Sequence, residues 1–265
     1  MNSIVCLKQV PDTEAQIRVK PDDSGIIAQD IKYVINPYDE FGVEEALKFK
    51  EKFGTGTVTI VSMGPQRAIE SIRMALAMGA DNAIHLDDPA FEDGDAFTTA
   101  KVLAQAIKGL EYDIIFCGRQ AIDDDFAQVG SALAELLGLP QIYLVTKVEV
   151  APDKKKARVN RQIVGGEEIV DCSLPAVLTC QKGLNEPRYA SLPGIMKAKK
   201  KEVKTINAAT LGVDLNQVGK AGAKCRIIKM SSPPSRSSGK KVAGADATET
   251  APQLVKLLRE ESKVI

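Results

Sequence analysis

The chain has 265 residues, 44% of them apolar, which is enough for a sizeable core in one large domain or in one domain with an extended appendage. Lys and Arg number 35, as do Asp and Glu, so the overall charge gives no electrostatic case for nucleic-acid binding. No run approaches the ~18 apolar residues of a membrane span, and Ile4 and Val5 enter a strand directly rather than a signal peptide. We therefore expect a cytoplasmic protein without direct membrane insertion.

Strand-like and helix-like segments alternate through the first half of the chain. Apolar runs predict strands at residues 4–7, 17–19, 57–62, 82–86 and 112–117, and amphipathic runs predict helices from residue 36 to near Gly54 and at 68–78, 98–107 and 131–137. Regular alternation of this kind implies an α/β fold with a doubly wound, mostly parallel sheet, which is the Rossmann-like, nucleotide-binding architecture.

The pattern changes after Pro140. Short alternating segments at 145–150, 157–163 and 167–172 predict an antiparallel meander, with Gly165 and Gly166 in a hairpin turn. The apolar run 174–180 is expected to rejoin the main sheet. We therefore expect a nucleotide-binding α/β domain over residues 1–183.

Residues 184–265 show little core-forming periodicity until an amphipathic run at 251–263. A structureless segment of this length is unusual on a compact monomer. We expect a C-terminal extended arm with a terminal helix, laid on the surface of another chain.

The segment from Cys117 to Gly130 joins a strand to a helix through an irregular turn. Backbone amides at such a junction lie at the carboxyl edge of a parallel sheet, where they and the helix dipole favour phosphate. Three consecutive aspartates, Asp123 to Asp125, would repel phosphate unless they turn toward a ribose, the helix amides or a partner chain. Spacing alone leaves an Asp-rich helix cap and a nucleotide site equally open.

Five segments in the same order resemble the beta subunit of electron transfer flavoprotein. They are residues 7–12 (LKQVPD), 36–39 (NPYD), 118–125 (GRQAIDDD), 159–177, and 185–201 (NEPRYASLPGIMKAKKK). Together they cover essentially the whole chain. Composition and spacing would not have led to this family.

The resemblance implies a non-catalytic half of a heterodimer, an electron carrier subunit rather than an independent enzyme. In this family the alpha subunit holds the redox FAD, and the beta subunit walls that flavin and holds a buried nucleotide. Residues 184–265 would then be a partner-docking loop and an arm wrapping the alpha subunit. The heterodimer would shuttle electrons from acyl-CoA dehydrogenases, as in fatty acid oxidation, to a membrane quinone oxidoreductase.

The resemblance also implies which residues bind the nucleotide. The matching positions are Cys6, Asn36, Pro37, Tyr38, Asp39, Met63, Gly118, Arg119, Gln120, Ala121, Ile122, Asp123, Asp124, Asp125, Phe126, Ala127, Gln128 and Val129. Phosphate is expected on amides near Ala127 to Val129, while Cys6 and Met63 are expected to line the adenine slot. Either of these two residues alone would be assigned to ordinary core packing.

Two nucleotides remain open for this site. The docking loop and the aspartate run look like those of members that hold AMP, which we favour. Residues 11–13 and 127–130 look like those of electron-bifurcating members that hold a second FAD, partly because Val129 lacks a hydroxyl for a phosphate. A third hypothesis is a nucleotide-binding sensor without redox work.

Two further groups of residues carry expectations. The resemblance marks Leu192 as the apolar anchor that enters a partner dehydrogenase, with Lys199, Lys200 and Lys201 steering the encounter. His85, the only histidine, lies in an expected strand far from any paired acid or serine, so we expect a surface or core role. The five cysteines lack metal or redox spacing and are expected to be reduced.

Overall fold

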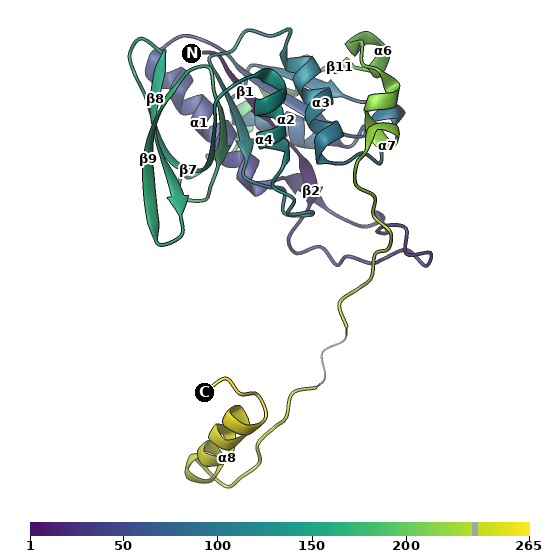
Figure 1. The fold of residues 1–265 in the computed structure, drawn as a ribbon, viewed down its shortest axis with the longest axis vertical. Coiled ribbons are helices and arrows are strands. Elements are labelled where there is room, and N and C mark those ends of the chain that lie inside the picture. Colours follow the sequence, from purple (N-terminus) through teal and green to yellow (C-terminus); the bar gives the residue numbers. More distant parts are fainter. Residues whose placement is uncertain (235–237) are drawn as a thin grey trace.

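Short apolar runs form a nine-stranded sheet in the part of the chain that the computed structural model describes, residues 1–234 and 238–265 (Figure 1). Its spatial order is β11 (Lys204–Ile206), β5 (Asn82–Leu86), β4 (Val58–Met63), β1 (Ser3–Cys6), β6 (Ile114–Gly118), β10 (Val177–Cys180), β7 (Gln141–Val150), β8 (Lys156–Ile163) and β9 (Gly166–Ser173). Pairing is parallel from β11 to β7 and antiparallel from β7 to β9. The mostly parallel sheet, the meander and the returning strand are confirmed.

Helices cover both faces of the sheet. They are α1 (Pro37–Phe53), α2 (Ala68–Met78), α3 (Ala96–Ile107), α4 (Val129–Leu137) and α5 (Leu192–Lys200), with short turns η1 (Pro89–Phe91), α6 (Ala208–Leu211), η2 (Leu215–Gln217) and α7 (Gly219–Gly222). Along β1, Val5 joins the core beneath α1 and α2, and Ile4 joins the core beneath α3 and α4. Because the central strands are buried on both faces, they read as continuous apolar runs.

The expected strand at residues 17–19 is wrong. Only Val19 pairs, in an isolated bridge with Ile26, within a long excursion between β2 (Gln9–Pro11) and β3 (Tyr33–Ile35). These two short strands form a separate antiparallel pair. The side chains at 17–19 alternate between apolar and polar, but they have no neighbouring strand or core to pack against. The alternation alone was therefore not sufficient to form a strand.

The packed body extends beyond residue 183, where we expected it to end. Strand β11 adds a parallel edge to β5, and Ala198, Ala208 and Val218 are buried in the two cores. Backbone amides of Lys224 and Cys225 still donate to Asp95 Oδ2, at 2.6 and 3.0 Å. Single small residues spaced ten apart give no helical or strand periodicity, which is why the sequence did not reveal this part of the body.

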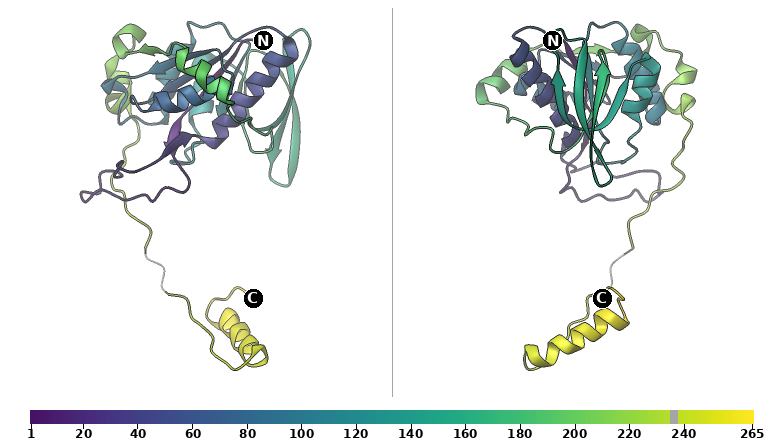
Figure 2. Two further views of the ribbon diagram at one scale, coloured as in Figure 1. Left: turned by 180° about the vertical axis from the view of Figure 1, so that it is seen from behind. Right: turned by 60° about the vertical axis from the view of Figure 1, so that its left-hand side comes forward.

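The C-terminal segment leaves the body after Met230, whose amide donates to Asp23 O at 3.0 Å. It ends in α8 (Ala247–Glu260), which lies apart from the sheet and its helices (Figure 2). No residue of α8 is buried, although Leu254, Leu257 and Leu258 form one apolar face. The extended arm and the terminal helix are thus present, with residues 235–237 outside the described part. No described helix has the length and apolar content needed to cross a bilayer.

Candidate functional site

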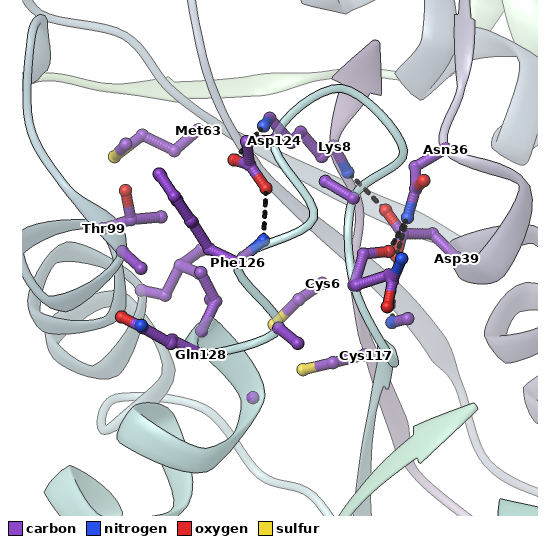
Figure 3. Close-up of a pocket in the computed structure, with 18 of the residues that line it drawn as sticks. Cys6, Lys8, Asn36, Asp39, Met63, Thr99, Cys117, Asp124, Phe126 and Gln128 are labelled. Atoms are coloured by element: carbon purple, nitrogen blue, oxygen red, sulfur yellow. Dashed lines mark hydrogen bonds and ion pairs between the residues drawn. The ribbon is translucent and has the colours of Figure 1, made fainter. Parts of the chain in front are cut away.

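A cavity of about 330 Å³ opens at the carboxyl ends of β1, β4 and β6 (Figure 3). The chain runs from β1 outward through β4 and β5 and then returns to the other side of β1 as β6. This reversal separates the connections that leave β1 and β6, and open α/β sheets bind ligands at such a switch point. The cavity volume lies at the lower end of the range for small-molecule sites.

Most of the expected nucleotide residues line this cavity. They are Cys6, Asn36, Asp39, Met63, Gly118, Arg119, Gln120, Ala121, Asp124, Phe126, Ala127, Gln128 and Val129. The structure does not place Pro37, Tyr38, Ile122, Asp123 or Asp125 on its wall. Tyr38 instead lies under the Arg119 guanidinium, 5.0 Å from ring centroid to Cζ, and the Ile122 amide donates to Asn36 Oδ1 at 3.2 Å.

One wall of the cavity was missed. It is formed by η1 and the start of α3, with Phe91, Asp93, Gly94, Asp95, Ala96, Thr99 and Leu103; Leu7, Lys8, Cys117 and Gly130 also line the cavity. Asp95 begins α3 through a capping box, in which its carboxylate accepts from the Thr98 amide and Thr98 Oγ1 accepts from the Asp95 amide, both at 2.9 Å. The Asp95–Thr98 pair indicates a helix start in the sequence, but it does not show that this helix lies beside the cavity, because that depends on strand order.

Asp39 braces the floor of the cavity. Its carboxylate accepts hydrogen bonds from the backbone amides of Lys8 (2.7 Å) and Gly118 (2.9 Å) and from Asn36 Nδ2 (3.0 Å). Burial raises the pKa of Asp39 to about 7, while these three donors work in the opposite direction. Because its two oxygens face these donors, Asp39 ties the ends of β1 and β6 to the first turn of α1.

Two glycines let the backbone approach closely around the site. A Cβ on Gly118 would meet the Asp39 carboxylate and stand 2.8 Å from Tyr38 Cβ. A Cβ on Gly130 would stand 2.6 Å from Thr179 Cγ2 on β10. Both glycines are therefore required by close packing between the loop after β6 and its neighbours.

The three aspartates are occupied within the protein. Lys8 Nζ binds Asp123 Oδ1 at 2.8 Å and Asp124 Oδ2 at 2.9 Å. Burial lowers the pKa of Lys8, but the two carboxylates outweigh this effect and raise it above its usual value. Asp125 accepts from Gln120 Nε2. The carboxylates thus bind Lys8 and the loop itself, which reduces their repulsion of an anion in the cavity.

Free backbone amides mark the start of α4. Among the described residues, the amides of 127–131 have no hydrogen-bond acceptor, and the Ala132 amide is the first to return a bond, to Gln128 O at 2.9 Å. Ala127, the first of these residues, has a left-handed backbone with φ of 55°. A row of unpaired amides at a helix N-terminus is a binding site for an anion such as phosphate.

The sulfur-lined side of the cavity is apolar. Cys6 and Cys117 are buried, and all five cysteines are free, as expected. Contact with Cys6 and burial raise the pKa of the Cys117 thiol well above its usual value, so the thiol stays neutral. Cys6 and Met63 line this side with small or flexible sulfur-containing side chains, which suit an aromatic base.

The expected docking residues lie on and after α5, away from the cavity. Leu192 is 80% exposed as the first residue of α5, and Lys199 and Lys200 are also exposed. Lys201 differs, because its ammonium group donates to the carbonyl of Ala80 on the body. His85 is fully buried in β5 with Nε2 2.8 Å from Gly64 O, which confirms a core role.

Comparison with known proteins gives one consistent family. Residues 24–211 match the electron transfer flavoprotein domain. The chain is 45% identical over 245 residues to the electron transfer flavoprotein subunit beta of Thermoanaerobacterium thermosaccharolyticum, covering 92% of this chain and 93% of that protein. It is 42% identical over 266 residues to the subunit beta of Mus musculus, covering 100% and 99%, and 43% identical over 261 residues to that of Clostridium acetobutylicum, covering 98% and 99%.

Proposed function

The chain belongs to the electron transfer flavoprotein family, in which its relatives are beta subunits, and from this premise we propose that it is the nucleotide-holding half of a heterodimeric electron carrier. The observation that supports a nucleotide is the row of free amides at residues 127–131, since residues 127–130 line a cavity that has an apolar, sulfur-lined side. An anion donor row and an apolar slot within one cavity suit the two ends of an adenine nucleotide.

We propose AMP as the resident nucleotide. A cavity of about 330 Å³ suits a mononucleotide, whereas a second FAD would have to extend its flavin half beyond it. Phosphate would lie on the amides of Ala127 to Val129, and the base would lie against Cys6 and Met63. The absence of a hydroxyl at Val129 removes one side-chain donor, so the amides and Lys8 would hold the phosphate.

The redox cofactor in this proposal is an FAD held mainly by an alpha subunit, and it supplies the electron-transfer chemistry. The contribution of this chain is to bind the nucleotide, to shield the flavin and to dock partners. The arm after Met230 would wrap the alpha subunit, because the exposed Leu254 face of α8 can be buried only by another surface. The cytoplasmic location expected from the sequence is part of this proposal.

Partner docking is assigned to the region around Leu192. We propose that this side chain enters a pocket on an acyl-CoA dehydrogenase, since it is 80% exposed at a helix start. Lys199 and Lys200 would increase the association rate through long-range attraction, whereas Lys201 is already bound to Ala80. A membrane quinone oxidoreductase would accept the electrons.

The visible spectrum and a nucleotide-release assay on the heterodimer test the proposal. One flavin together with one AMP per dimer is the expected result. Two flavins and no AMP would instead identify the bifurcating type, and a colourless dimer with a bound nucleotide would identify a non-redox sensor. A matched pair, Gly118→Ala and Gly109→Ala, localises the nucleotide: only Gly118→Ala should reduce its content, because a Cβ on Gly109 meets nothing within 4 Å.

A further inference from the structure

Helix α5 presents opposite faces to the body and to solvent. Ile195 and Ala198 pack into the core beneath α1 and α2, where α5 lies against α2 (Figure 2). Leu192 and Met196, one turn apart, are 80% and 60% exposed on the other face. We call residues 185–201 the docking segment. Its exposed leucine and methionine are held on a helix rather than on a loose loop.

The start of the docking segment is fixed to α1. Asn185 Nδ2 donates to Phe41 O at 3.0 Å and to Glu45 Oε2 at 2.9 Å. Arg188 then forms a fork with Glu44, from Nε at 2.8 Å and from Nη2 at 3.0 Å, and its Nη1 reaches Glu51 Oε1 at 2.6 Å. The Glu44 side chain is only 6% exposed and that of Arg188 is 35% exposed, so the carboxylate end of this bidentate pair is shielded from water and its geometry is defined.

The end of the docking segment is fixed to α2. Arg73 Nη1 donates to Ala198 O at 2.8 Å and lies 3.4 Å from Lys201 O and 3.5 Å from Lys199 O. These carbonyls lie at the C-terminal end of α5, where Ala198 O also accepts from the Lys201 amide at 3.2 Å. Lys201 adds a bond from its ammonium group to Ala80 O. A cation at this end also complements the helix dipole.

We infer that Arg73 and Arg188 are positioning residues, which hold the docking segment in its binding-competent shape before a partner arrives. They touch neither the cavity nor the exposed face of α5, and each anchors one end of the segment that carries Leu192. A segment that is already folded loses less conformational freedom on docking. The inference rests on the docking role proposed for Leu192.

The experiment uses the heterodimer and stopped-flow reduction of its flavin by an acyl-CoA dehydrogenase. Arg73→Met should raise the apparent KM for the dehydrogenase about fivefold and leave the limiting rate unchanged, because the flavin site is untouched. Arg73→Lys should recover most of the loss, since an ammonium group can still donate to the α5 carbonyls. Arg158→Met is the control: its two side-chain bonds both go to Asp171 across the β8–β9 hairpin. Arg188→Lys should resemble Arg73→Met, because lysine keeps the charge but not the fork.

A double-mutant cycle of Arg73→Met and Leu192→Ala shows whether Arg73 affects the KM through Leu192 or independently of it. If Arg73 acts through Leu192, Arg73→Met should add little to the KM of Leu192→Ala. Amide hydrogen exchange in residues 192–200 should become faster in Arg73→Met and stay unchanged in Leu192→Ala. Unaltered exchange in Arg73→Met, or a full multiplicative effect in the double variant, would overturn the inference. An unaltered KM in Leu192→Ala would reject the proposed docking anchor instead, and exchange alone would then decide the positioning.

Discussion

The body of this protein buries its apolar side chains within the chain itself, whereas the C-terminal arm leaves its apolar side chains at least partly exposed. In the body, strands such as β1 and β6 are buried on both faces, and cores on either side of the sheet account for the burial. In the arm, α8 has a well-formed apolar face and no buried residue. The apolar side chains of the body are therefore shielded from water by the body itself. Those of the arm need the surface of another protein to shield them. The contrast shows that an amphipathic pattern specifies what must be buried but not by which chain.

The largest expected effect that tests this contrast is on proteolysis. In the isolated chain, cleavage should concentrate in residues 231–234 and 238–246, at a rate on the order of 100-fold above that in the body, because no side chain of these residues is buried. In the heterodimer the same sites should be protected. Mass spectrometry of timed digests measures both states. Early cleavage within 192–222 would show that this part belongs with the arm and not with the body.

The pH dependence of stability tests whether the buried Asp39 contributes to the stability of the body. With its pKa raised from 3.8 to about 7, the folded chain keeps a proton that the unfolded chain has released between these pH values. Stability should therefore fall as pH rises through this window, by on the order of 4 kcal/mol from this group. Asp39→Asn cannot titrate, so the stability of the native chain relative to this variant should decline from pH 4 to pH 7. Urea unfolding of the isolated chain at several pH values measures the difference, and parallel curves would contradict the assignment.

Substitution of Gly130 by alanine is expected to change the free energy of unfolding by a smaller amount, in the direction opposite to that usual in a helix. Alanine normally stabilises a helical position relative to glycine by ~0.5–1 kcal/mol. At Gly130 the added Cβ would stand 2.6 Å from Thr179 Cγ2, so Gly130→Ala should instead destabilise the body by ~1–3 kcal/mol. Gly109→Ala, where the Cβ meets nothing within 4 Å, is the control and should stay within about 0.5 kcal/mol. A stabilising Gly130→Ala would mean that α4 and β10 pack less closely.

The smallest effect on the isolated chain is expected in α8. Leu257→Asp should leave the melting temperature of the isolated chain unchanged, because no residue of this helix is buried. In the heterodimer the same change should weaken association at least about tenfold, corresponding to ~1.4 kcal/mol. Lys256→Asp, on the opposite face of the helix, is the control. Equal association in both variants would show that this face of α8 does not contact the alpha subunit.

Much of the fold was predictable because burial leaves a local pattern. The runs at 57–62 and 82–86 became β4 and β5, and the strand–turn–helix at 117–130 became the cavity rim. Residues 17–19 show the limit of such patterns, since their alternation found no neighbouring strand. Strand β11 shows the opposite limit: three residues became an edge strand only because β5 offered a partner.

The sequence by itself determined the α/β class, the position of the cavity rim and the family. The tertiary structure alone decided how the charges are arranged: Lys8 meets Asp123 and Asp124 across more than a hundred residues, Asp39 braces two strand ends, and α3 supplies a cavity wall. The physical reason is that periodicity records which face of one element is buried, whereas a hydrogen bond or ion pair depends on which elements become neighbours. That neighbourhood is set by strand order, which a local pattern does not contain.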